Sequence, residues 1–155
     1  MTLSRQWATF RRAGLLMPTA IFPGRYDSLA AIAELVHQAA QEFGLDFCAA
    51  YAVETSVDEA CSNIIEHSYR GENLGNIEIS YDIRGNELII TLKDSGKKFR
   101  PKKISQPDLN APLHRREDHG LGLYFMHQWM DDVQFDYLDG QNVLTMIKRK
   151  GPIAE

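Results

Sequence analysis

An α+β two-layer sandwich, with a mostly antiparallel sheet and helices on one face, is the fold that the sequence predicts. Three observations support it: two consecutive segments have apolar residues at helical spacing, two later segments alternate as hairpins do, and a third helical segment lies between these hairpins. The chain has 155 residues, of which 44% are hydrophobic and 25% charged, as in a globular domain. We expect a leader over residues 1–17, one domain over 18–150 and a tail over 151–155.

The first expected elements are a short strand over residues 19–22 and a helix that ends before Gly44. Asp27 and Ser28 are candidate N-caps, and glycine is the usual C-terminal stop. The apolar residues that recur at helical spacing between these signals are Leu29, Ile32, Ala33, Val36, Ala40 and Phe43.

A second helix is expected over residues 46–69. Its apolar side carries Phe47, Ala50, Val53, Val57, Ala60, Ile64 and Ser68. A step of four residues advances only about 40° around a helix, so Glu59, Asn63 and His67 form one polar row on the other side.

Two hairpins complete the sheet. The first joins residues 76–83 to 87–93 through Arg84-Gly85-Asn86, and the second joins 133–138 to 143–149 through Asp139-Gly140. Between them a helix is expected over residues 120–130.

The segment from residue 95 to 119 shows no periodicity and differs in charge from the rest of the chain. The segment has a net charge of +4. Because the whole chain has a net charge of −4, the remaining residues together carry −8. Its basic residues are Lys97, Lys98, Arg100, Lys102, Lys103, Arg115 and Arg116. Long aperiodic loops are often lids or binding elements, and this one suits a polyanion such as a nucleotide triphosphate. A solvated loop whose charges only aid solubility is the alternative.

Several functional classes are disfavoured. Two cysteines are too few for a disulfide framework, and such sparse use of cysteine fits a reducing cytosol. The chain has no run of apolar residues long enough to cross a bilayer. The acidic balance argues against binding of nucleic acid or anionic lipid over the whole surface. A metal site made from Cys48, Cys61 and His67 is not expected, because Cys61 and His67 lie on different sides of one helix.

The polar row on the second helix could carry chemistry. The Glu59 carboxylate could accept a proton or orient a nucleophile, and the amide oxygen of Asn63, one turn later, is a hard ligand suited to Mg²⁺. An ordinary exposed helix face is the alternative explanation.

Two further motifs fit the same kind of site. Asp94 at a strand end could accept a hydrogen bond from an exocyclic amine, while Gly96 would let a flat base approach the backbone. The sequence His119-Gly120-Leu121-Gly122-Leu123 opens a helix, where free N–H groups and the helix dipole favour phosphate. A routine turn and close helix packing are the alternatives when each motif is taken singly.

In this order the motifs resemble the histidine-kinase-type (Bergerat-fold) ATPases, and in particular the anti-sigma-factor serine kinases. The resemblance is carried by Glu-Ala-x-x-Asn-x-x-x-His-x-Tyr at residues 59–69, by residues 94–99, by residues 119–126 and by residues 130–133, and it covers roughly residues 18–150. Lys98 stands where the wider superfamily often has a second glycine.

The resemblance implies a role for each matching residue. Glu59 is the general base toward a serine hydroxyl, and Asn63 holds Mg²⁺. The adenine amino group is bound by Asp94, and Gly96 lines the base pocket. The residues expected to contact phosphates are Gly120, Leu121 and Gly122, with Arg115 or Arg116 reaching the γ-phosphate.

The function implied is that of a cytoplasmic ATP- and Mg²⁺-dependent serine kinase. It phosphorylates a small anti-anti-sigma protein and sequesters a sigma factor, without direct contact to nucleic acid or membrane, and a homodimer is compatible with this class. A non-catalytic ATP-binding module that sequesters a partner is the alternative. A two-component histidine kinase would need a phosphoacceptor histidine on a helix pair, for which residues 1–17 are too short.

Overall fold

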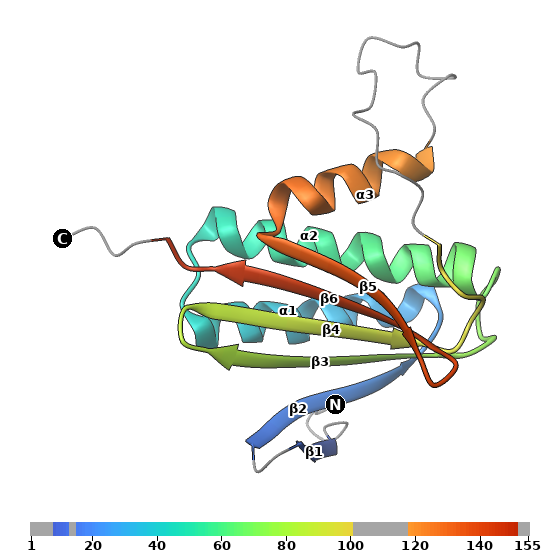
Figure 1. The fold of residues 1–155 in the computed structure, drawn as a ribbon, viewed down its shortest axis with the longest axis horizontal. Coiled ribbons are helices and arrows are strands. Elements are labelled where there is room, and N and C mark those ends of the chain that lie inside the picture. The colour runs from blue at the N-terminus through green and yellow to red at the C-terminus, as the bar shows by residue number, and fades with distance from the viewer. Residues whose placement is uncertain (1–7, 13–14, 101–117, 152–155) are drawn as a thin grey trace, which may run out of the picture.

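The computed structural model describes residues 8–12, 15–100 and 118–151. These residues form one six-stranded antiparallel sheet with the order β1-β2-β3-β4-β6-β5. The strands are β1 (Ala8–Arg12), β2 (Leu15–Pro23), β3 (Asn76–Arg84), β4 (Glu87–Asp94), β5 (Asp132–Leu138) and β6 (Gln141–Arg149). The helices are α1 (Leu29–Phe43), α2 (Phe47–Asn63) and α3 (Asp118–Trp129), and they lie on one side of the sheet (Figure 1). The predicted α+β sandwich is therefore confirmed.

Both expected hairpins are present. In the second one, Asp139 and Gly140 have φ values of 52° and 77°, the positive values that a tight two-residue turn between strands requires. At the other edge, β2 is longer than the expected strand over residues 19–22, and β1 pairs with it from Ala8↔Thr19 to Arg12↔Leu15. Part of the expected leader thus belongs to the sheet, and the domain boundary at residue 18 stays a prediction.

The core lies between the sheet and the helices. The inward side of β4 buries Leu88, Ile90 and Leu92, and alternate residues of β3 and β6 do the same. The opposite side of the sheet is more polar, and it forms an open groove lined in part by Met17, Thr19, Glu78, Ser80, Thr91 and Lys93. The amphipathic helices thus cover only the apolar side of the sheet.

The end of α1 and the start of α2 follow the sequence, whereas Ser28 at the start of α1 makes no capping hydrogen bond and its Oγ donates to Pro23 O at 2.7 Å. Gly44 ends α1 in the left-handed conformation with φ 80°, and the Asp46 carboxylate caps α2 by accepting a hydrogen bond from Ala49 N at 2.8 Å. Two residues expected on the apolar faces are exposed: Ala33 on α1, and Phe47, which is 85% exposed and stacks on Tyr51. At about 100° per residue Phe47 lies about 120° around the helix from the buried Val53, so it is outside the buried stripe.

The second helix does not continue as a regular α-helix to residue 69. After Asn63 it becomes a π-helical turn, η2 (Ile64–Ser68), in which the hydrogen bonds span five residues instead of four. The wider turn changes the angular step after Asn63. The continuation of the row from Glu59 and Asn63 to His67 stays a prediction. Ser68 lies at the end of β4, where its Oγ donates a hydrogen bond to Asp94 Oδ1.

Tyr81 predicts a loss of stability at high pH. Its buried hydroxyl donates a 2.6 Å hydrogen bond to Glu42 Oε2 on α1, and burial, followed by this bond, raises the pKa of Tyr81 to about 12. Because the unfolded value is about 10, the contribution of this group is complete below pH 10 and is lost as the pH rises from 10 to 12. We expect Tyr81→Phe to cost about 0.5–1.5 kcal/mol at pH 8 and much less at pH 12, measured by urea unfolding. A cost that does not change with pH would contradict this assignment.

Candidate functional site

The Asp94 carboxylate, at the end of β4, is the centre of a hydrogen-bond network. It is only 5% exposed, and its Oδ1 accepts hydrogen bonds from Ser68 Oγ, from Gly96 N at 3.0 Å and from Asn142 Nδ2 at 3.0 Å. Among the described residues, all hydrogen bonds to this carboxylate go to Oδ1. Oδ2 is therefore the atom left to accept a hydrogen bond from a ligand.

Gly96 lies where the turn after β4 touches the π-helical turn. A Cβ atom at this position would lie 2.3 Å from Ser68 Oγ and 2.6 Å from the Ser68 carbonyl carbon, so no side chain fits without movement. The two segments are joined further by hydrogen bonds from Lys97 N to Ser68 O and from Ser95 N to the Tyr69 hydroxyl, both 2.9 Å. The Tyr69 hydroxyl donates to Asn76 O at 2.6 Å, and burial raises the pKa of this group.

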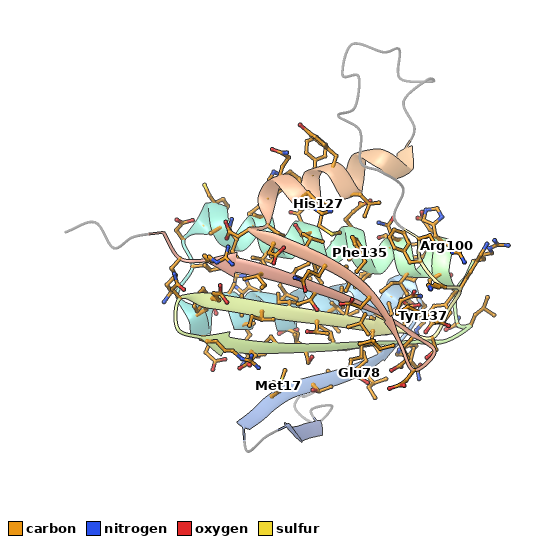
Figure 2. The ribbon with its side chains drawn as sticks, in the orientation of Figure 1. Met17, Glu78, Arg100, His127, Phe135 and Tyr137 are labelled. Carbon is orange, nitrogen blue, oxygen red and sulfur yellow. The ribbon has the colours of Figure 1, made fainter. Side chains whose placement is uncertain are left out.

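A cavity of about 50 Å³ opens beside Asp94 between the sheet, α2 and α3. Its polar lining includes Asn63, Ser68, Asp94 and Asn142, and its apolar lining includes Ala60, Ile64, Phe99, Leu123, Met126, Phe135 and Leu144. Figure 2 shows Phe135 on β5, below α3 in this view. Apolar walls with a few convergent polar groups suit a flat heteroaromatic ring that carries a hydrogen-bond donor.

Glu59 lies where α2 packs against α3. A Cβ atom on Gly122 would lie 1.8 Å from Glu59 Oε1, so the glycine is what lets the carboxylate approach the helix backbone. Since Asn63 follows Glu59 by one turn and lines the cavity, the structure brings the polar row of α2 and the glycine-rich helix to the same side of the molecule.

The expected phosphate-contacting residues have different positions in α3. The helix begins at Asp118, two residues earlier than expected, so Gly120 and Leu121 lie in its first turn, whose N–H groups have no partner within the helix. Gly122 is the fifth residue and faces Glu59 instead. Arg115 and Arg116 lie outside the described residues.

Sequence reasoning missed Asn142, Ser68 and Phe99 as site residues. Asn142 is the clearest omission, because it is only 7% exposed and contacts Asp94 directly. A sequence signal existed: Asn142 has the same parity along the last strand as the buried Leu144 and Met146, and a polar residue at a buried position needs partners. His67 is not among the residues that line the cavity.

Neither cysteine is among the residues that line the cavity. Cys61 is buried, which raises the pKa of its thiol, whereas Cys48 is exposed. Within the described ranges, no three His, Cys, Asp or Glu side chains come together as a metal site. No helix in the same ranges has the length and apolar character needed to span a bilayer.

Comparison with known families and proteins finds a domain family that matches most of this chain. A model of the histidine kinase-like ATPase domain matches residues 22–148. The chain is 29% identical over 126 residues to proteins named serine-protein kinase RsbW from Bacillus thuringiensis (strain Al Hakam) and Bacillus mycoides (strain KBAB4). The match covers 79% of this chain and 78% of either relative.

Two solved structures share the fold. One contains the RsbU and RsbW domains of a Mycobacterium tuberculosis protein, with a TM-score of 0.62 and 15% identity over 90% of this chain, which spans 34% of that longer chain. The other is the catalytic domain of histidine kinase ThkA, with a TM-score of 0.51 and 12% identity, covering 86% of this chain and 98% of that domain. At these identities the likeness concerns the fold alone.

Proposed function

This chain belongs to the histidine kinase-like ATPase domain family, and from that premise we propose that it is an ATP-dependent serine protein kinase. Its protein substrate is a small regulator of the anti-anti-sigma class, and its second partner is a sigma factor that it sequesters. Transcription is then controlled by partner switching, without direct contact between this chain and nucleic acid. Support for the kinase class comes from the relatives, which are named serine-protein kinases.

The observation that carries the proposal is the convergence of three elements on one cavity. Asn63 on α2 and Asp94 at the end of β4 line it together with Leu123 and Met126 of α3, while Glu59 contacts the glycine-rich half of α3. We assign the purine to the apolar cavity, with its exocyclic amine donating to Asp94 Oδ2. The triphosphate then extends along α2 toward the first turn of α3, where Gly120 and Leu121 offer N–H groups.

Phosphoryl transfer needs mainly positioning and neutralisation of charge. The Glu59 carboxylate accepts the proton of the substrate serine hydroxyl. The serine oxygen then forms a bond to the γ-phosphorus, the bond from this phosphorus to the β–γ bridging oxygen breaks, and ADP leaves with that electron pair. Arg115 or Arg116 is proposed to reach the γ-phosphate.

Asn63 is the residue proposed to hold Mg²⁺. Its donor chemistry fits, because a neutral amide oxygen at the edge of the cavity suits a cation that keeps several water molecules and binds substrate phosphates. The ion would supply neutralisation of the phosphate charge during transfer.

The test is incubation of the full chain with Mg²⁺, γ-labelled ATP and a serine-bearing protein of the anti-anti-sigma class. Label on the partner's serine is the expected result. Saturable ATP binding with no transfer would instead support the non-catalytic module, in which the chain sequesters its partner but does not modify it. Absence of ATP binding would contradict both functions.

Gly122→Ala is expected to reduce phosphotransfer more than stability. The added methyl group meets the flexible end of Glu59 at 1.8 Å, so the carboxylate moves while the fold persists, and alanine also favours the helix. A small misplacement of a reacting group can cost roughly 10- to 100-fold in rate. Single-turnover kinetics and thermal unfolding measure the two effects. Gly151→Ala is the control, because its Cβ atom would have no neighbour within 4 Å. A large fall in Tm with an unchanged rate would contradict the prediction.

A further inference from the structure

Asn142 lies directly beside Asp94 on the neighbouring strand. The two residues are partners in the β4–β6 register, and the amide of Asn142 is buried on the inward side of the sheet. Leu144 and Met146 are the next inward residues of β6, so a polar side chain here interrupts an apolar row. Such a side chain needs several partners to offset the loss of water.

Both ends of the Asn142 amide are hydrogen-bonded. Nδ2 donates to Asp94 Oδ1 at 3.0 Å, to Lys97 O at 2.9 Å and to Ser68 Oγ at 3.2 Å, while Oδ1 accepts from Phe99 N at 2.7 Å. One side chain therefore joins the Asp94 carboxylate to the backbone of residues 95–100, which we call the exit segment because it leaves β4.

The side chains of the exit segment also contact the β5–β6 hairpin. The rings of Phe99 and Phe135 have centroids 4.9 Å apart, and Lys98 Nζ lies 5.1 Å from the centre of the Tyr137 ring. Figure 2 shows Arg100 and Tyr137 at the same end of the sheet. These aromatic side chains are half-buried or exposed. Asn142 therefore provides the buried polar part of the contact between the exit segment and the β5–β6 hairpin.

The position of Phe99 links the exit segment to the cavity. Phe99 is part of the wall, and the remaining space of about 50 Å³ is far below the roughly 300–1,000 Å³ that is usual for ligand sites. Entry of a purine therefore requires part of this wall to move, and Phe99 is the lining residue that belongs to the exit segment. The Phe99 N–H donates to Asn142, so a movement that carries the backbone of Phe99 along with its ring changes the hydrogen bonds of the residue that also holds Asp94.

We propose that Asn142 is a positioning residue that couples the exit segment to the nucleotide-binding carboxylate, so that occupation of the cavity and the position of residues 97–99 depend on each other. The proposal rests on the proposed function only for the identity of the ligand. The donor side of the amide orients Asp94 for the purine, and the acceptor side holds Phe99 in the cavity wall.

The test separates the two sides of the amide. Asn142→Leu removes both, whereas Asn142→Asp keeps an acceptor for Phe99 N–H but places a second carboxylate beside Asp94. Ser68→Ala is the control, since it removes a donor to Asp94 and one acceptor of Asn142 Nδ2 but leaves the bond from Phe99 N to Asn142 Oδ1 in place. Amide hydrogen exchange of Phe99 is measured by NMR without nucleotide, and ATP affinity is measured by calorimetry.

We expect exchange at Phe99 to be at least about tenfold faster in Asn142→Leu, and within about threefold of the unmodified chain in Asn142→Asp and Ser68→Ala. ATP affinity should fall at least about tenfold in both Asn142 variants. In the unmodified chain ATP should change Phe99 exchange, and in Asn142→Leu it should not. Unchanged exchange in Asn142→Leu, or equally fast exchange in Ser68→Ala, would overturn the proposal. If Asn142→Leu does not fold, Asn142→Asp still tests the proposal, because its ATP affinity should fall while its Phe99 exchange stays nearly unchanged.

Failure of the unmodified chain to bind ATP overturns the proposed function. The exchange measurements without nucleotide would still test the hydrogen bond between Asn142 and Phe99.

Discussion

An Asp94→Asn variant is expected to bind ATP at least roughly 100-fold more weakly than the unmodified chain. The change replaces a charged acceptor with a neutral amide of nearly the same size, so the cavity keeps its shape. A hydrogen bond to a charged group contributes about 1.5–3 kcal/mol, and a factor of ten corresponds to about 1.4 kcal/mol. An unfavourable contact between two donors adds to this loss.

The three donors around Oδ1 determine which way the new amide points. Ser68 Oγ, Gly96 N and Asn142 Nδ2 all present hydrogen atoms, so the amide oxygen occupies their side and its NH₂ group takes the place of Oδ2. A purine amine would then face another donor. A purine with a carbonyl oxygen at the same ring position, as in GTP or ITP, would instead find a donor, so the preference between these nucleotides should shift toward the 6-oxo purines.

Calorimetric titration with ATP, GTP and ITP measures both the loss and the shift. The control is Asp139→Asn, which makes the same charge change at the exposed β5–β6 turn, where asparagine tolerates the positive φ of 52°. Unfolding by urea checks that the variant is folded. Equal weakening toward all three nucleotides would show that Asp94 only supports the fold, and unchanged ATP affinity would remove it from the site.

The sheet and helices could be predicted because local rules and tertiary packing agree in them. Alternating residues in β3 and β4 mark one buried side of the sheet. The residue that ends α1 has a left-handed conformation, which favours glycine, so Gly44 could be recognised as the helix end. Phe47 was misassigned because apolar character alone does not place a residue on the buried stripe of a helix. β1 was missed because pairing of an edge strand depends on the neighbouring strand and not on its own pattern.

The candidate site could be predicted only in part. Glu59, Asn63 and Asp94 stand in recognisable motifs, and the structure places them around one cavity or beside it. The π-helical turn after Asn63 has no such signal, since it arises where the end of α2 meets the turn after β4, and it is what brings Ser68 to Asp94. Asn142 is far from these motifs along the chain and reaches Asp94 only through strand pairing.

Glu59→Gln is the change expected to affect catalysis most. The amide keeps the size of the side chain and its approach to Gly122, but it cannot accept a proton at neutral pH. Loss of a general base typically lowers a rate by roughly 10²–10⁴-fold. ATP affinity should stay within about threefold, because in the proposed mode Asp94 and Asn63 hold the nucleotide and Glu59 faces the serine.

Single-turnover transfer from γ-labelled ATP to the partner's serine and calorimetric ATP binding together measure this separation. Glu54→Gln is the matched control, since Glu54 lies on the same helix but pairs with His37 at 2.5 Å on an exposed side, away from the cavity. Equal losses of transfer and ATP affinity in Glu59→Gln would place this carboxylate in nucleotide binding and not in proton transfer. If the unmodified chain transfers no phosphate, and Glu59→Gln binds ATP and the partner as well as the unmodified chain does, the protein is the non-catalytic module. Glu59 would then serve only to join α2 to α3.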